Sequence, residues 1–210
     1  MPSLTLFAIP LRVVPYAITA HRPDLVLSVM PRDETEEPFP QLPPLTRHHW
    51  CEIHDCHFAE ADLSPLARRR TVSAFRDEYG SSTPHLITGR KTWLLLREID
   101  RLIEEGQQSS KTLIAHCHGG VSRSQAAAYL TLCKILGPGQ EERAIDALMS
   151  ANHYALPNPM LVWQADRLMK RGGAMVAALQ RSKDYPSRSQ AAGLTIDLKS
   201  QSISVDDFFI

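Results

Sequence analysis

Residues 112–130 have the sequence TLIAHCHGGVSRSQAAAYL, and this stretch decides the fold of the chain. Its first part, 112–116, is a continuous apolar run typical of a strand buried on both faces of a sheet. From residue 123 onward, the apolar side chains have the spacing of an amphipathic helix. A cysteine, two glycines, a serine and an arginine stand between these two elements. The sequence therefore places a thiol where a buried strand ends and a helix begins.

The rest of the chain alternates short apolar runs with helical patterns. Three further strands are predicted at 4–9, 25–30 and 49–53, and helices at 12–21, 91–105, 123–136, 141–150 and 159–179. Breaks are expected at 137–139, at 151–158 and at Gly172–Gly173. Such alternation predicts the α/β class, with a central, mostly parallel sheet of four to five strands flanked by helices.

The length of 210 residues and the 43% apolar content are typical of a single folded domain. We expect this domain to span residues 1–183, with a partly helical excursion inserted at about 58–90. The Pro-rich, charged residues 31–47 are expected to form an exposed loop. The tail, 184–210, is Ser-rich and is expected to be either an added strand or disordered.

Charge and cysteine content limit the partners and the compartment. Lys and Arg together equal Asp and Glu, 23 each, so the balance favours neither nucleic acid nor an anionic membrane as a partner. Four cysteines are too few for a disulfide scaffold, and the N-terminal apolar stretch lacks the basic start of a signal peptide. No apolar run approaches the ~20 residues of a membrane span. We therefore expect a cytoplasmic protein with reduced thiols.

Cys117 lies where open α/β sheets bind their ligands, beyond the carboxyl end of a strand. Gly119 and Gly120 allow successive backbone N–H groups to face an anion, and the helix N-terminus adds its positive dipole end. The same environment favours the thiolate, which is the nucleophilic form of cysteine. Arg123 carries a planar fork that suits two phosphate oxygens, and Ser124 can donate a hydrogen bond to the sulfur.

The string HCHGGVSRS, 116–124, fits the HCxxGxxR[ST] signature at every fixed position and resembles the cysteine-dependent protein tyrosine phosphatases. Its GVSRS part is most similar to the dual-specificity branch. The segment PNPMLVWQ, 157–164, resembles the PN…Q segment of the MAP-kinase phosphatases. The order of elements from about residue 4 to 180 is also similar to a bacterial group of small phosphatase-like proteins.

This resemblance implies a protein tyrosine phosphatase-like fold and a two-step reaction through a cysteinyl-phosphate. Cys117 would be the nucleophile and Arg123 the phosphate-binding arginine, assisted by Ser124. His116 and Asn158 would support the site without contacting the phosphate. The substrate-binding groups would be the backbone amides of His118, Gly119, Gly120, Val121, Ser122 and Arg123.

The resemblance also implies an aspartate that acts as general acid, and three residues are candidates. Asp55 follows the predicted strand 49–53, which is the expected place in the topology, but it lies farther upstream of Cys117 than is usual in the family. Asp62 is somewhat nearer. Asp77 matches the family spacing best, yet it lies in a helix-like charged stretch that is typical of a solvated face. Asp55 is the preferred candidate.

The segment HHWCEIHDCHF, 48–58, is rich in residues that bind zinc, namely His48, His49, Cys51, His54, Cys56 and His57. Alternation along a strand would send these side chains to opposite faces, and no second ligand pair at zinc-finger spacing follows. We therefore expect no metal site and no cofactor. Cys56 could instead form a protective disulfide with Cys117 under oxidation.

Three functions remain open from the sequence. The first is a phosphate-monoester hydrolase acting on a phosphorylated protein or a small phosphate ester, through a site that also takes phosphate, sulfate or vanadate. The second is a catalytically weak module that only binds phosphate. The third is a phosphoinositide phosphatase, which the absence of lysine from the loop disfavours.

Overall fold

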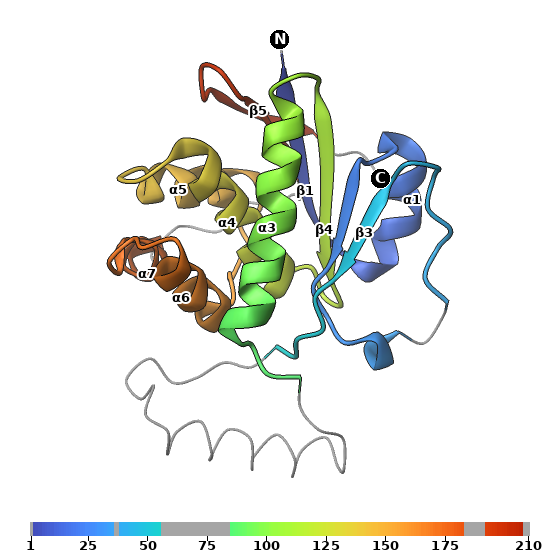
Figure 1. Ribbon diagram of the computed structural model, residues 1–210, viewed down its shortest axis with the longest axis horizontal. Coiled ribbons are helices and arrows are strands. Elements are labelled where there is room, and N and C mark those ends of the chain that lie inside the picture. The colour runs from blue at the N-terminus through green and yellow to red at the C-terminus, as the bar shows by residue number, and fades with distance from the viewer. Residues whose placement is uncertain (1, 36–37, 56–84, 183–191, 208–210) are drawn as a thin grey trace.

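The computed structural model describes residues 2–35, 38–55, 85–182 and 192–207 (Figure 1). These residues form one six-stranded sheet with the order β3-β2-β4-β1-β5-β6. The four strands from β3 to β1 run parallel, whereas β5 and β6 are antiparallel to their neighbours. The strands are β1 (Ser3–Pro10), β2 (Leu25–Ser28), β3 (Arg47–Trp50), β4 (Lys111–Cys117), β5 (Ala192–Asp197) and β6 (Ile203–Asp207).

The predicted α/β class with a mostly parallel sheet is confirmed by this topology. Among the described residues the sheet has six strands, not the four to five expected, because β5 and β6 extend it beyond β1. Both added strands come from the C-terminal part of the chain, where the sequence left an added strand and disorder as alternatives.

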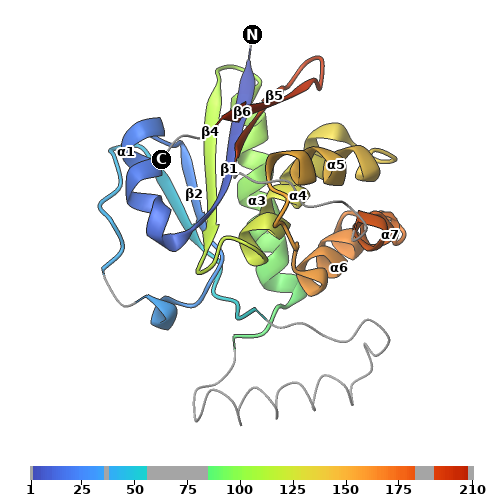
Figure 2. The same cartoon turned by 180° about the vertical axis from the view of Figure 1, so that it is seen from behind.

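Helices cover both faces of the sheet (Figures 1 and 2). One face carries α1 (Val14–His21), which follows a 3-10 turn at Leu11–Val13. The larger core lies on the opposite face. It is covered by α3 (Gly89–Gly106), α4 (Arg123–Leu136), α5 (Glu141–Ala151), α6 (Pro159–Leu168) and α7 (Ala174–Arg181).

Strand alternation divides the core into these two parts. Leu113 of β4 belongs to the larger cluster under α3 to α7, whereas the next residue, Ile114, belongs to the smaller cluster under α1. Both side chains are fully buried. A strand buried on both faces has few polar positions, which is why residues 113–115 are all apolar and the buried His116 after them is hydrogen-bonded.

The strand predicted at 49–53 lies earlier in the structure, because β3 is Arg47–Trp50. After Cys51 the backbone carbonyl groups accept hydrogen bonds from side chains and no longer from a neighbouring strand. The carbonyl oxygen of Glu52 accepts from Nζ of Lys91 at 2.6 Å, and that of Ile53 accepts from Arg123 at 2.9 Å. The strand therefore ends before the segment that reaches the site.

The helix predicted over 159–179 is two helices, α6 and α7. They separate at the predicted glycine break, where Gly172 and Gly173 have φ of 62° and 91°. Asp166 stabilises the restart, since its carboxylate accepts from the N–H groups of Gly173 and Met175 at 2.7 and 2.9 Å. The predicted helix 12–21 likewise begins as a 3-10 turn before α1.

The topology places the end of β4 at the centre of the parallel strands. At this edge, Cys117 lies opposite Pro10 of β1, and His116 lies opposite Ser28 of β2. The loop that follows Cys117 is therefore flanked by the carboxyl ends of two neighbouring strands, as in other ligand-binding α/β sheets. None of the described helices is long and apolar enough to cross a lipid bilayer.

Leu113→Ala is expected to lower the free energy of unfolding by about 2–5 kcal/mol, because it leaves a cavity between the sheet and its helices. Leu45→Ala is the matched control, since Leu45 is 98% exposed, and a change within about 0.5 kcal/mol is expected there. Urea unfolding of both variants tests this. Equal losses would contradict the assignment of Leu113 to the core.

Candidate active site

The backbone carbonyl groups of the loop between β4 and α4 accept hydrogen bonds from the residues around it. The carbonyl oxygen of His118 accepts from the N–H of Leu11 at 3.1 Å, and that of Val121 accepts from Leu156 at 2.8 Å. The carbonyl oxygen of Gly120 accepts from Nε2 of Gln125 at 2.7 Å, and that of Ser122 accepts from the N–H of Asn158 at 3.3 Å. These residues are His118, Gly120, Val121 and Ser122 of the loop, with Leu11, Gln125, Leu156 and Asn158 around it.

The direction of the loop amides follows from those contacts. In a trans peptide the N–H points away from the C=O of the same unit. Because four carbonyls face outward, the N–H groups of the residues that follow them face the centre of the loop. These are the amides of Gly119, Val121, Ser122 and Arg123, and together they form a concave array of donors suited to an anion.

Gly120 makes this arrangement possible. It has φ of 71°, and a Cβ atom built on it would lie 2.4 Å from the backbone nitrogen of Pro10. Only glycine fits such a close approach to the end of β1. Gly119, by contrast, has no neighbouring atom within 4 Å of such a Cβ.

The Cys117 thiol lies at the base of the loop and is 2% exposed. Its sulfur accepts from the N–H of Gly120 at 3.3 Å and lies 3.3 Å from Oγ of Ser124. Two other described cysteines, Cys51 and Cys133, are free and buried outside the loop. Burial raises the pKa of each to about 12, so both remain thiols.

Arg123, the first residue of α4, is buried and divides its guanidinium between two roles. Its Nη1 and Nη2 donate to the two carboxylate oxygens of Glu34 at 3.0 and 2.8 Å. Burial by itself lowers the pKa of Arg123, but the hydrogen bonds and charge of Glu34 raise it on balance. The buried Nε has no hydrogen-bond acceptor among the described residues. The edge formed by Nε and Nη2 therefore remains as a fork for an oxyanion.

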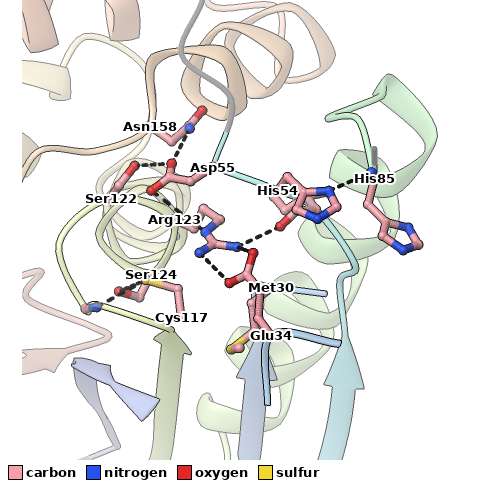
Figure 3. A network of polar contacts seen from close by, with 12 residues as sticks. Met30, Glu34, His54, Asp55, His85, Cys117, Ser122, Arg123, Ser124 and Asn158 are labelled. Carbon is pink, nitrogen blue, oxygen red and sulfur yellow. Dashed lines mark hydrogen bonds and ion pairs between the residues drawn. The ribbon is translucent and has the colours of Figure 1, made fainter. Parts of the chain in front are cut away.

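Asp55 lies against the loop, in contact with three residues of the site (Figure 3). Its Oδ1 accepts from Oγ of Ser122 at 2.6 Å and from Nδ2 of Asn158 at 2.8 Å. Its Oδ2 is 3.9 Å from Nε of Arg123. The carboxylate, which is 34% exposed, thus faces the open edge of the guanidinium.

Asn158 links this carboxylate to α6. It is the N-cap of that helix, where its Oδ1 accepts from the N–H of Leu161 at 3.0 Å. Its side-chain Nδ2 donates to Oδ1 of Asp55, and its backbone N–H donates to the carbonyl oxygen of Ser122. Because the side chain is fully buried, one residue fixes the helix start, the loop and the carboxylate relative to one another.

His116 is buried directly behind the thiol. Its Nε2 lies 2.6 Å from Oγ of Ser28, and Nε2 of His48 lies 2.7 Å from the same oxygen. A single hydroxyl can donate to one ring and accept from the other. One of the two Nε2 atoms therefore carries a proton, and the other is unprotonated. Burial, with His48 nearby, lowers the pKa of His116 to about 3, so this imidazole is neutral at neutral pH.

The structure therefore brings most of the predicted residues together. Cys117, Ser124, Arg123, Asp55 and Asn158 surround the loop (Figure 3). The alternative acids Asp62 and Asp77 lie outside the described residues, as do Cys56 and His57. Among the described residues, no group of three or more His, Cys, Asp or Glu side chains could hold a metal ion.

Two contributors to the site were missed in the sequence. Glu34 was part of a segment predicted to be an exposed loop, yet it pairs with Arg123 from far upstream in the chain. Gln125 was assigned only to the helix, yet it binds the carbonyls of Gly120 and Ala8 at 2.7 and 2.9 Å. No local pattern marks either residue, since Glu34 acts through a contact that is distant in sequence and Gln125 joins the nearby Gly120 to the distant Ala8.

Gly120→Ala is expected to lower the free energy of unfolding by at least about 1–2 kcal/mol, the cost of a left-handed conformation for a residue with a Cβ. The contact with Pro10 adds to this cost. Gly119→Ala is the control, because the added methyl group meets open space. Urea unfolding measures both. Similar losses in the two variants would contradict the close packing of Gly120 on β1.

No protein-family model and no curated protein matches the chain. In structure, the chain is similar to human DUSP28, with 18% identity and a TM-score of 0.49 over 80% of this chain and 94% of that chain. It is also similar to DUSP15, with 13% identity and a TM-score of 0.46 over 88% and 94% of the two chains. A third similar structure is Tk-PTP in the active form, with 14% identity and a TM-score of 0.44 over 80% and 92%. Similarity this loose assigns no activity to the chain.

Proposed function

We propose that this chain is a phosphate-monoester hydrolase of the cysteine-dependent protein tyrosine phosphatase superfamily, of the dual-specificity-like branch. One observation carries the proposal. A buried thiol accepts from Gly120 and lies beside Ser124, inside a loop whose amides face inward and whose arginine has one edge left for an oxyanion. A thiolate below a tetrahedral oxyanion site is the arrangement that in-line attack on phosphorus requires.

The first step transfers the phosphoryl group to the protein. The phosphoryl oxygens accept from the inward amides and from Nε and Nη2 of Arg123. The Cys117 thiolate attacks phosphorus opposite the ester oxygen, so that an S–P bond forms while the P–O bond breaks. The ester oxygen leaves with the bonding electron pair and takes a proton from Asp55. The position of Asp55 suits this role, because Oδ1 already accepts two hydrogen bonds and the proton is then carried by Oδ2.

The second step returns the free thiolate. A water molecule attacks phosphorus while the Asp55 carboxylate accepts its proton, and inorganic phosphate forms as the P–S bond breaks. The sulfur leaves with the bonding pair. Its negative charge is stabilised by the N–H of Gly120 and by the hydroxyl of Ser124, which lie 3.3 Å from the sulfur.

The substrate class that we propose is a phosphorylated protein, with phosphotyrosine and then phosphoserine or phosphothreonine as the reacting ester. Small phosphate esters would enter the same loop, and phosphate, sulfate and vanadate would bind it. The reaction as written needs no cofactor. A free catalytic thiol suits a reducing compartment such as the cytoplasm, which is where we propose that the protein acts.

Cys117→Ser is expected to abolish turnover of p-nitrophenyl phosphate, on the scale of the ~10⁶-fold loss that follows removal of a catalytic nucleophile. A serine hydroxyl cannot form the thiolate-like nucleophile near neutral pH, whereas the amides and Arg123 still bind phosphate. Turnover is measured together with phosphate-induced thermal stabilisation. Cys133→Ser, at a buried cysteine outside the loop, is the control and keeps its turnover. Substantial turnover by Cys117→Ser would overturn the covalent mechanism.

Asp55→Asn is expected to slow hydrolysis of phenyl phosphate by about 10²–10⁴-fold, the usual contribution of a general acid. An ester of an acidic phenol, whose oxygen leaves without a proton, should be affected much less. The ratio of the two kcat/KM values is the measurement. Asp33→Asn removes an exposed carboxylate of the neighbouring segment and should leave the ratio unchanged.

An equal loss for both leaving groups would show that Asp55 has only a structural role. In that case the chain would fit the alternative, a phosphate-binding module with weak catalysis, or an enzyme whose acid is Asp62 or Asp77. The corresponding Asn variants at those two positions distinguish these outcomes.

A further inference from the structure

A cavity of about 610 Å³ opens beside the loop. Its described lining comes from the loop residues His118 and Gly119, from the end of β1 with the 3-10 turn and the start of α1 after it, and from residues 34–35 and 38–40. Its volume lies within the range typical of ligand pockets, ~300–1,000 Å³. The cavity adjoins the oxyanion site, so whatever is attached to a bound phosphate extends into it or past it.

Arg12 is held at the rim of this cavity. Pro10 packs against Gly120, and the N–H of Leu11 donates to the carbonyl oxygen of His118 at 3.1 Å. Both contacts fasten the residues just before Arg12 to the loop itself. The position of the Arg12 backbone relative to the bound phosphate is therefore fixed by the same contacts that shape the loop.

The charge of Arg12 is not used elsewhere in the described part of the chain. Its side chain is exposed and makes no hydrogen bond or ion pair there. Glu34 is the described carboxylate in the lining, and both of its oxygens already accept from Arg123 at 3.0 and 2.8 Å (Figure 3). Among the described lining residues, Arg12 is thus the cationic side chain available to pair with a ligand.

Residues 38–40 give the cavity an apolar wall. Phe39 stacks on His48 and His116 with ring centroids 4.5 and 5.4 Å apart, and it makes a T-shaped contact with Trp50 at 5.5 Å. Pro38 and Pro40 stand on either side of it. A wall of one anchored aromatic ring and two prolines suits the flat face of an aromatic leaving group.

From this geometry we infer that the cavity is a specificity subsite for an aromatic phosphate ester with a second anionic group close to it. The chemistry fits a phosphotyrosine next to an acidic residue in a peptide. Arg12 is the specificity-determining residue, which pairs with the carboxylate while the ring lies along the Phe39 wall. The inference rests on the proposed function, because it places the phosphate in the loop.

The test compares two phosphotyrosine peptides of equal length, one with Asp and one with Asn on both sides of the tyrosine. The wild-type chain should hydrolyse the Asp peptide with a kcat/KM about two- to fivefold higher, the effect of one exposed ion pair. Arg12→Met should bring this ratio close to one, mainly through KM, and Arg12→Glu should invert it. Arg22→Met is the control and should preserve the ratio, since Arg22 is the C-cap of α1 and is not among the residues that line this cavity.

The same peptides are then titrated onto the Cys117→Ser variant, with and without Arg12→Met. The preference for the Asp peptide should appear in the dissociation constants, so that the subsite is tested even if turnover is absent. An equal affinity for both peptides would overturn the subsite and leave the phosphatase proposal standing. A preference for a matched Lys peptide would overturn it as well. No turnover with a retained preference would overturn the proposed function alone.

Discussion

The close approach of Gly120 to Pro10 is the constraint on which the site depends. A Cβ atom at residue 120 would lie 2.4 Å from the backbone nitrogen of Pro10, so the loop can rest on β1 only where a side chain is missing. With the loop in that position, Leu11 and Leu156 can bind its carbonyls from outside. The N–H groups consequently face inward, and the thiol of Cys117 lies beneath them. One missing side chain thus determines the direction of a whole set of hydrogen-bond donors.

The buried guanidinium of Arg123 is stabilised before any ligand arrives. Removing a charge from water is costly unless it is paired and hydrogen-bonded. Glu34 and the carbonyl of Ile53 supply those partners at 2.8–3.0 Å. Because they occupy Nη1 and one side of Nη2, the planar group is fixed with Nε toward Asp55. The arginine is therefore preorganised for an oxyanion and does not have to reorder when one binds.

Much of the fold could be predicted from the sequence, for a simple physical reason. A strand buried on both faces is mostly apolar, so 112–116 was recognisable as a strand, and α4 begins and ends at the predicted residues. Gly172 and Gly173 likewise marked the break between α6 and α7. The strand predicted at 49–53 was wrong by a few residues, since backbone groups after Cys51 bind Lys91 and Arg123 instead of the sheet. Those partners are distant in sequence and leave no local pattern.

By itself, the sequence determined the local chemistry of the site: a thiol at a strand end, glycines that turn the backbone, and an arginine and a serine at a helix start. These residues are near one another in the chain, so their spacing alone implies their proximity. Asp55 was the preferred one of three candidate acids, but only the tertiary structure decided that this carboxylate and that of Glu34 join them. Asp55 reaches the loop through Ser122 and Asn158, and Glu34 reaches Arg123, across separations of 67 to 103 residues. Such contacts depend on how strands are ordered in the sheet, and no spacing along the chain encodes that order.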